Sequence, residues 1–419
     1  MKWLKSKKDY WVSFIFCLPG KGELIQLALF LLLLLLSLLR VEREYRYMWF
    51  EEEGLVHVLI LAPPSERDER LSATVKIVGG DFPELYQKRA FLTLYGASDV
   101  PSKAFSVWAK VKAEGQRVFV SGSYKDIQEV LTHEPTLRDR FIKRVEERVQ
   151  DQELKALVLT YVFGESKEIL FQDVQYYFLK TGLVHLLVIS GFHVGMVFLV
   201  LRYLLPYPYG LWLGALGVSL YVFLLVPSEP PVLRAWLMLL LWVFVRLNQA
   251  SPNGLGILLF SASLLLFIKP EFVHSFSFWL SFFATLYILL GMRLLPSYGS
   301  VFYRYLVLPF GVSFFAFLGV SPLLLSLTHA SLGSILFSPL VGYMFLPFTL
   351  YGILQLSTFF SLPTFPLELM GHVIVLTVAI LSNFNLELRV TLSKEWAFAV
   401  SSFFAILLYA FGTLKRVEK

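Results

Sequence analysis

After residue 182 the chain is a succession of long apolar segments separated by short loops. A helix needs about 17–25 mostly apolar residues to cross the hydrocarbon core of a bilayer. Because that core offers no water to a bare backbone, such segments are expected to be helical. Together with one earlier segment, they predict a polytopic α-helical membrane protein with about ten spans. The expected spans lie at 24–39, 183–204, 210–226, 231–247, 253–268, 272–294, 305–328, 331–357, 364–383 and 395–413.

Charge is distributed unevenly along the chain. Charged residues make up 16% of the 419 residues, and most of them lie before residue 180. In typical soluble domains about 25% of the residues are charged. The net charge of +6 suits either basic cytoplasmic ends or a polyanionic ligand, and it does not separate the two. Cys17 is the only cysteine, so the chain forms no intrachain disulfide and no paired-cysteine metal site.

Residues 1–50 are expected to form a basic segment followed by a membrane anchor. The apolar piece at 10–18 is too short to span and suits the membrane interface, whereas the run at 24–39 can span if Glu23 and Arg40 snorkel. A signal peptide is the competing interpretation, but charged residues follow the run where a small-residue cleavage site is needed. Lysines ahead of the run favour an uncleaved anchor with the N-terminus inside.

Residues 51–131 have the pattern of short strands and turns. β-Branched and aromatic residues fill the expected strands, and glycine or proline separates them. Five short strands predict a small all-β domain of the OB-like barrel type, a fold often used on oligonucleotides. The strands are expected at Leu55–Leu61, Ser72–Val78, Arg89–Tyr95, Phe105–Lys112 and Arg117–Gly122.

Four residues of this barrel are candidates for binding a nucleic-acid strand: Tyr95, Trp108, Lys110 and Lys112. Aromatic rings stack on bases, and lysines attract phosphates. The competing interpretation places the rings in the core and the lysines on an ordinary solvated surface.

Residues 132–182 are predicted to form amphipathic helices at the membrane interface, at Pro135–Phe163 and Lys167–Thr181. Residues 183–419 then form the transmembrane domain. An even number of spans places both termini on one side. With the termini in the cytoplasm, the basic residues of the loops lie mainly inside, as the positive-inside rule requires. The barrel is then extracytoplasmic, and we expect a multi-pass membrane protein with both termini in the cytoplasm.

The segment from His185 to Leu199 is apolar but carries two histidines, a serine and two glycines. In a continuous helix, Ser190 and His193 share a face and His185 lies about two turns from His193. The small-xxx-small pair of Gly191 and Gly195 allows another helix to approach. Ionisable groups at membrane depth usually face a partner or a pathway, so this helix is a candidate channel lining. The alternative is a packing helix whose histidines only bond to neighbours.

Arg234 is the second intramembrane candidate. It either snorkels and pairs with Glu229, or points into the bundle and offers positive charge to a phosphate backbone. His274, Ser281, His329, Ser331 and Ser334 are weaker candidates and suit core positions.

Enzymatic chemistry is not favoured. Ser190 and His193 could form a nucleophile and base, but no aspartate follows Asp173 to orient them, and the late glutamates lie mostly at the ends of spans. A Gly-rich phosphate loop is absent, and no clustered His/Asp motif predicts a metal. We expect no metal and no cofactor. An intramembrane hydrolase using Ser190 stays a minor alternative.

The motifs resemble those of the ComEC-type competence proteins. Gly182–Gly195 is similar to the family signature of His-Leu-Leu, Ile-Ser-Gly, His and Gly. The similarity covers about 135–350, and the predicted barrel lies where the family has an OB-like domain. Two positions depart from the family: Trp279 replaces a frequent glutamine, and Ser334 replaces a frequent asparagine. Supporting segments are LKALVLTYVFGES before the signature, PVLRAWLM at 231–238, FSFWLSFFATL at 276–286 and the turn at 334–339.

The resemblance implies a channel that passes single-stranded DNA into the cytoplasm during natural transformation. Many relatives append a metallo-β-lactamase-like domain, which this chain lacks after its last span, so a separate nuclease is implied. The resemblance places His185, Ser190, Gly191, His193, Gly195, Arg234, Phe278, Leu280 and Ser281 on family motifs; all of these except Leu280 are taken as candidate channel-lining residues.

The leading hypothesis is therefore a non-enzymatic inner-membrane DNA channel. Its implied partners are single-stranded DNA, membrane lipid, a DNA-receptor protein outside, a cytoplasmic ATP-driven translocase and the separate nuclease. The alternative is a secondary transporter of a smaller solute with a site at the bilayer midplane.

Overall fold

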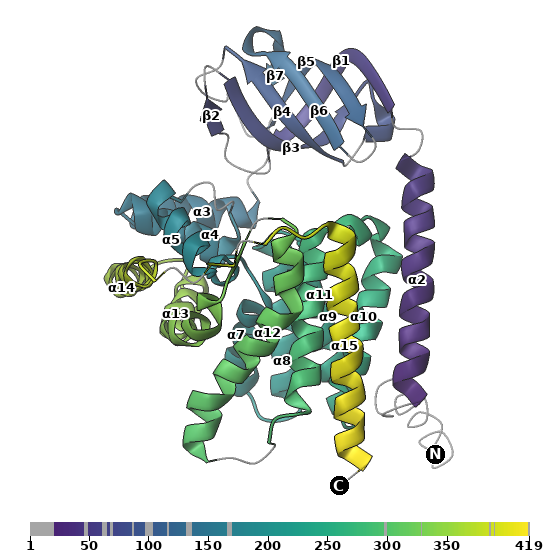
Figure 1. Ribbon diagram of the computed structural model, residues 1–419. Helices are drawn as coiled ribbons and strands as arrows, with labels where there is room; N and C mark the ends of the chain where they lie inside the picture. Colours follow the sequence, from purple (N-terminus) through teal and green to yellow (C-terminus); the bar gives the residue numbers. More distant parts are fainter. Residues whose placement is uncertain are drawn as a thin grey trace, which may run out of the picture. The chain divides into compact units, whose positions relative to one another are not determined.

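The computed structural model of the protein describes residues 21–45, 49–60, 65–67, 70–85, 88–96, 104–114, 117–130, 136–165, 170–296, 300–327, 329–384, 387–388 and 390–417. The chain divides into two compact units, a β-barrel and a helical bundle (Figure 1). The barrel unit takes residues 38–140 with 165–169, and the bundle takes the rest. The predictions for residues 1–20, including the apolar piece at 10–18 and Cys17, lie outside the described residues.

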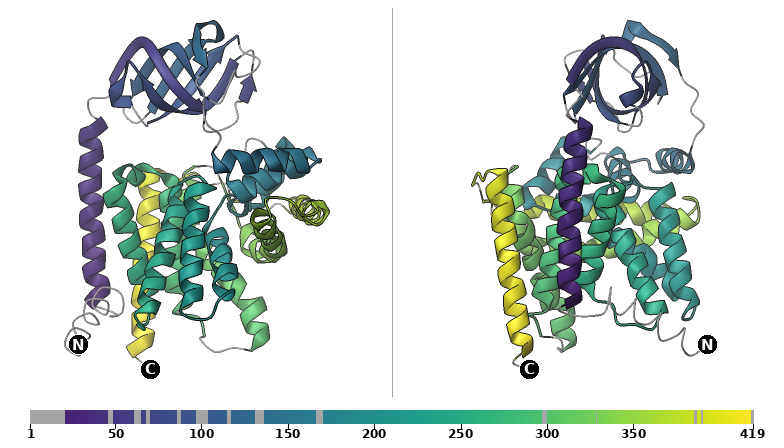
Figure 2. Two further views of the ribbon diagram at one scale, coloured as in Figure 1. Left: turned by 180° about the vertical axis from the view of Figure 1, so that it is seen from behind. Right: turned by 90° about the vertical axis from the view of Figure 1, so that its right-hand side faces the viewer.

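The barrel is closed by strands that pair in the order β1–β3–β4–β6–β5 and back to β1. β4 and β6 are parallel, and the other neighbours in the ring are antiparallel. The right-hand view of Figure 2 looks down the axis of the barrel, so that the strands appear as a ring. A closed five-stranded ring confirms the predicted small barrel and fits the OB-like class. The strands are β1 (Trp49–Ile60), β2 (Ser65–Arg67), β3 (Arg70–Gly80), β4 (Arg89–Tyr95), β5 (Ala104–Glu114), β6 (Arg117–Ser123) and β7 (Ile127–Val130).

Alternation along the strands separates the barrel core from its outer face. On β5, Val107, Ala109 and Val111 are buried, whereas Trp108 and Lys110 are exposed. Successive side chains of a strand point to opposite faces, so each strand contributes every second residue to the core. The remaining side chains form an outer surface that is free to carry charge or bind a ligand.

Every apolar segment predicted to span contains a helix. Among the described residues, five helices are able to cross a membrane by length and composition, and the other apolar helices have 10–17 residues, so ten spans remain a prediction. The helices are α2 (Lys21–Tyr45), α3 (Leu137–Arg148), α4 (Gln152–Phe163), α5 (Gln172–Thr181), α6 (Val184–Leu187), α7 (Gly191–Tyr203), α8 (Tyr209–Leu224), α9 (Pro230–Leu247), α10 (Gly254–Ile268), α11 (Phe276–Met292), α12 (Leu308–Leu325), α13 (Gly333–Ser357), α14 (Phe365–Leu381) and α15 (Lys394–Val417).

Two of the long helices run across the others. α15 lies along the vertical of Figure 1 and α12 runs obliquely to it, whereas α13 and α14 are seen almost end-on there and again from behind in Figure 2. α13 also stays continuous through Pro339 and Pro347, and α12 through Pro322. These prolines therefore do not break their helices. Neighbouring helices supply the packing that compensates for the lost backbone hydrogen bonds.

The segment expected as one amphipathic helix at Pro135–Phe163 is two helices of different character. α3 has a charged outer face and buries only Phe141 and Val145. α4 follows after Asp151, which caps it, and is buried on nearly every side. The expectation of an amphipathic, interfacial helix therefore does not describe α4, whose apolar residues form part of the bundle core.

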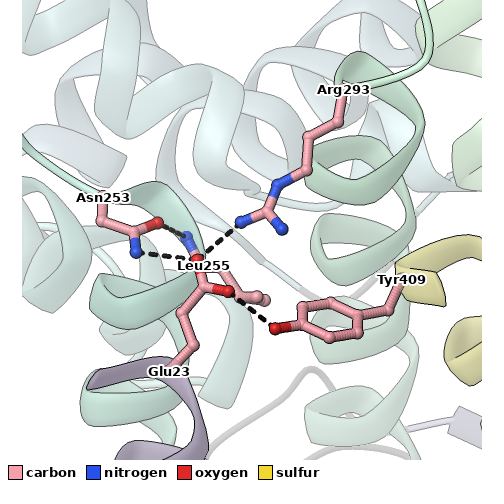
Figure 3. Close-up of polar contacts among 5 residues, drawn as sticks. All are labelled: Glu23, Asn253, Leu255, Arg293 and Tyr409. Carbon is pink, nitrogen blue, oxygen red and sulfur yellow. Dashed lines mark hydrogen bonds and ion pairs between the residues drawn. The ribbon is translucent and has the colours of Figure 1, made fainter. Parts of the chain in front are cut away.

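A buried carboxylate fastens α2 to the bundle (Figure 3). Glu23 Oε1 accepts hydrogen bonds from Asn253 Nδ2 at 2.8 Å and from Arg293 Nη2 at 2.7 Å, and Glu23 Oε2 accepts one from the Tyr409 hydroxyl at 3.1 Å. These donors belong to the cap of α10, the cap of α11 and α15. Glu23 is 4% exposed, so the expectation that its side chain snorkels to the membrane surface is wrong.

Replacing Glu23 with leucine is expected to destabilise the protein by about 3–5 kcal/mol, because Arg293 would be left buried without its partner. The measurement is the free energy of unfolding in mixed micelles titrated with denaturing detergent. Leu31→Ala, on the exposed face of the same helix, is the control and should change it by less than about 0.5 kcal/mol. Equal effects of the two variants would show that the carboxylate does not fasten α2.

Candidate membrane channel site

The signature segment is a broken helix. α6 ends at Leu187, Val188 and Ser190 are extended, and α7 begins at Gly191. The prediction of one continuous helix over 183–204 is therefore wrong, and His185 does not lie on a common helical face with Ser190 and His193. Non-helical backbone at membrane depth is tolerated where it is enclosed by protein or lines a cavity.

Ser190 and His193 cap the second half of the broken helix. Ser190 Oγ accepts a hydrogen bond from the Phe192 N–H at 3.3 Å, and His193 Nδ1 accepts one from the Ser190 N–H at 3.2 Å. This reciprocal arrangement is a capping box. The His193 imidazole therefore bonds to the backbone of Ser190 and does not activate its hydroxyl. An acceptor Nδ1 also places the proton of the neutral ring on Nε2.

Ser190→Asn is expected to preserve folding and transport, because asparagine caps helices as well as serine does, whereas Ser190→Ala should cost about 1 kcal/mol of stability. The measurement is unfolding in mixed micelles together with labelling by a serine-reactive fluorophosphonate probe. Labelling of the wild type at Ser190, or loss of function in an asparagine variant that stays folded, would instead favour the hydrolase.

His193 is enclosed by aromatic side chains. It is 3% exposed and lies 4.3 Å from the Tyr161 ring, centroid to centroid. Tyr161, on α4, stacks on Phe345 of α13 at 4.6 Å, and its hydroxyl bonds to Thr349. His193 Nε2 is buried without a hydrogen-bond partner. The signature therefore places one unpaired N–H donor at the meeting of α4, α7 and α13.

Arg234 connects the signature to a second motif. Its neighbour Ala235 lies against Gly191 at the start of α7. Arg234 is 7% exposed, and its Nη1 donates to the Ser281 carbonyl and, at 2.6 Å, to Thr285 Oγ1, both on α11. Nε has no partner. Among the described residues no carboxylate pairs with Arg234, so the expected alternative of a pair with Glu229 is not observed.

The start of the signature packs on α13. Gly182 ends α5 with φ +73°, and a Cβ there would lie 2.9 Å from Ser331 Cβ and 3.1 Å from Ser334 Cβ. Only glycine meets both demands. His185 Nε2 lies 3.4 Å from Ser338 Oγ, and its Nδ1 lies 3.0 Å from the Gly182 carbonyl oxygen. The late turn, predicted from 334–339, thus meets the signature in space.

Two predicted lining residues have different surroundings from those expected. Phe278 is 1% exposed and packs among the rings of Phe272, Trp279 and Phe282, so it belongs to the aromatic core. Gly195 has no heavy atom within 4 Å of the position of an added Cβ. The expected close helix packing at Gly195 is therefore wrong: the glycine borders open space.

The predicted barrel residues are exposed but not equivalent. Trp108 and Tyr95 are 45% and 44% exposed. Lys110 Nζ lies 2.6 Å from Glu51, and Lys112 Nζ lies 2.6 Å from Glu114. These hydrogen bonds raise the pKa of both lysines above the ordinary value. Their charges are thus already met by carboxylates.

Sequence reasoning missed the partners of the signature residues. None of these partners has a motif spacing of its own, although three of them lie in segments that resemble the family. The three are Tyr161, Thr285 and Ser338, and the fourth partner is Thr349. Polar side chains within apolar segments were the available signal. Within the described part of the chain, no group of three or more His, Cys, Asp or Glu residues is placed to hold a metal ion.

Comparisons with known proteins agree with these motifs. The family model described as Competence protein matches residues 161–417. An uncharacterized protein of Aquifex aeolicus is 37% identical over 345 residues, which is 82% of this chain and 82% of that protein. Recombination protein 2 of Haemophilus influenzae is 26% identical over 254 residues, which is 54% of this chain but 32% of that protein. No solved structure matches.

The matched region begins at Tyr161 and includes the broken helix, Arg234, α11 and α13. All of the contacts described among these elements therefore lie within the family domain. The chain is an integral membrane protein that belongs to the Competence protein family.

Proposed function

We propose that this chain is an inner-membrane channel that passes single-stranded DNA into the cytoplasm during natural transformation. The observation that carries the proposal is Arg234, a cation buried in a membrane helix without a carboxylate partner among the described residues. A buried, uncompensated charge is costly. A passing phosphate would supply the missing countercharge, and membership in the Competence protein family supports a DNA substrate.

The broken helix supports the same role. The N-terminal end of α7 carries a partial positive charge, and His193 offers a buried N–H without a partner. The helix end and the unpaired N–H both favour the binding of an anion. Because Ser190 and His193 form a cap, the channel works without hydrolysis. A cytoplasmic ATP-driven translocase, an external DNA receptor and a separate nuclease complete the proposed system.

The proposed orientation rests on the ends of the helices. Tyr207 bonds to the Arg246 carbonyl, and Glu23 joins the start of α2 to Arg293 and to the last turns of α15. Basic residues thus gather at the end of the bundle that holds the start of α2 and the end of α15. By the positive-inside rule this end is cytoplasmic, and the barrel lies outside.

The test is entry of DNA into proteoliposomes that enclose a DNA-binding dye. An inside-positive potential pulls the polyanion through the purified protein. We expect single-stranded oligothymidine to enter and duplex DNA to stay outside. Vesicles that exclude the oligonucleotide but accumulate a small solute would identify a secondary transporter instead.

A further inference from the structure

Charge is segregated around the barrel. The adjacent strands β3, β4 and β6 contain four basic residues (Arg70, Lys76, Arg89 and Arg117) and no acidic residue. β1, on the far side of β3 in the ring, contains Glu51, Glu52 and Glu53. The β3, β4 and β6 side of the barrel is therefore a basic sector, whereas the glutamates of β1 lie beside the lysines of β5. A basic sector attracts polyanions even when the whole domain is not basic.

An aromatic pair, exposed at Phe91 and half-buried at Phe119, lies in the middle of the basic sector. Phe91 on β4 pairs in register with Phe119 on β6, and their rings stack at 5.8 Å between centroids. Phe91 is 54% exposed. A large apolar ring on the outside of a barrel adds nothing to the core, and a flat face next to cations suits a planar partner.

A second aromatic residue belongs to the same surface. Tyr95 on β4 pairs in register with Arg70 on β3, and the Arg70 guanidinium lies 5.3 Å from the centre of the Tyr95 ring. Cation–π contact holds the arginine beside the ring. Two residues earlier on β4, Thr93 separates this pair from Phe91 on the same face. Along β4 this outer face therefore carries Arg89, Phe91, Thr93 and Tyr95, with Lys76 opposite Arg89 and Arg70 opposite Tyr95 on β3.

We propose that this surface of Arg70, Lys76, Phe91, Tyr95 and Phe119, here named the stacking face, binds single-stranded nucleic acid. Bases stack on the Phe91–Phe119 pair and on Tyr95, while Arg70 and Lys76 meet the phosphates without sequence readout. The inference deepens the proposed function, since it names where the strand is first held. The stacking face lies on β3, β4 and β6. The earlier candidates Lys110 and Lys112 lie on β5, where they already pair with Glu51 and Glu114.

The experiment measures the affinity of the full chain, in nanodiscs of zwitterionic lipid, for fluorescent oligothymidine. Phe91→Thr/Phe119→Thr is expected to weaken binding by about tenfold to 100-fold, because each base stacked on an aromatic ring contributes substantially. Threonine is a good strand residue, so the barrel should stay folded, as thermal unfolding will check. The matched control is Trp108→Thr on β5, which removes a ring of similar exposure and should have little effect.

A second variant tests the cations independently. Arg70→Gln/Lys76→Gln is expected to reduce the slope of log affinity against log salt by about 0.7 for each lost phosphate contact. The proposal is overturned if the wild type does not bind the oligonucleotide, which would leave a protein ligand for this face, or if Trp108→Thr weakens binding as much as the double phenylalanine variant. Binding that depends on the stacking face without DNA entry would instead contradict only the channel.

Discussion

Arg234→Met is expected to reduce entry of single-stranded DNA into proteoliposomes by about 100-fold while the protein stays folded. A hydrogen bond to a charged group contributes about 1.5–3 kcal/mol, which corresponds to roughly tenfold to 100-fold in the rate of a step that depends on it. Methionine matches much of the volume of the arginine. Replacing a buried charge with an apolar residue of similar size is often neutral for stability.

The partners of Arg234 provide the controls. Thr285→Val removes one acceptor of the guanidinium but keeps the cation, so DNA entry should stay within about threefold of the wild type. Thr285 Oγ1 also donates to the Ser281 carbonyl at 3.1 Å, so the hydroxyl keeps a partner in the methionine variant. If Arg234→Met unfolds the protein, or if it passes DNA normally, the cation is a structural link between α9 and α11 and not a phosphate contact.

The barrel was predictable because its signal is local. Strand alternation in a half-buried sheet depends on neighbouring residues alone, and β4 was predicted at Arg89–Tyr95, where it is observed. The binding face was not predictable in the same way. Lys110 and Lys112 look available in the sequence, and only the pairing of β5 with β1 brings Glu51 beside Lys110. The basic sector likewise exists only once β6 is placed next to β4.

For the membrane site, the sequence identified the candidate residues but not their geometry. The residues were found from their polarity within apolar segments, whereas their arrangement along one continuous helix was predicted wrongly. Helical periodicity placed Ser190 and His193 on one face, whereas serine at the start of a helix prefers an extended backbone and caps the next turn. Serine is a favoured residue at the start of a helix, so a helix that begins after Ser190 was predictable in principle, whereas histidine is not the usual fourth residue of a capping box. The contact of His193 with Tyr161 joins residues far apart in sequence, and no local pattern encodes it.

The open space beside Gly195 leads to the sharpest steric test of the channel. Gly195→Phe is expected to fold with wild-type stability, since no heavy atom lies within 4 Å of an added Cβ and glycine is itself unfavourable within a helix by about 1 kcal/mol. A phenyl ring that projects into the path of the strand should lower entry of single-stranded DNA at least about tenfold, a barrier increase of about 1.4 kcal/mol.

The matched control is a glycine in a crowded place. A Cβ on Gly319 of α12 would lie 2.7 Å from the Phe283 carbonyl oxygen and 3.0 Å from the Tyr287 ring on α11. Gly319→Phe should therefore fail to fold, because overpacking against backbone is not relieved by a rotamer change. Gly195→Phe introduces the same side chain at a position where no heavy atom lies within 4 Å of the added Cβ. If Gly195→Phe is stable and passes DNA at the wild-type rate, then the space beside Gly195 holds lipid and the strand follows another path through the bundle.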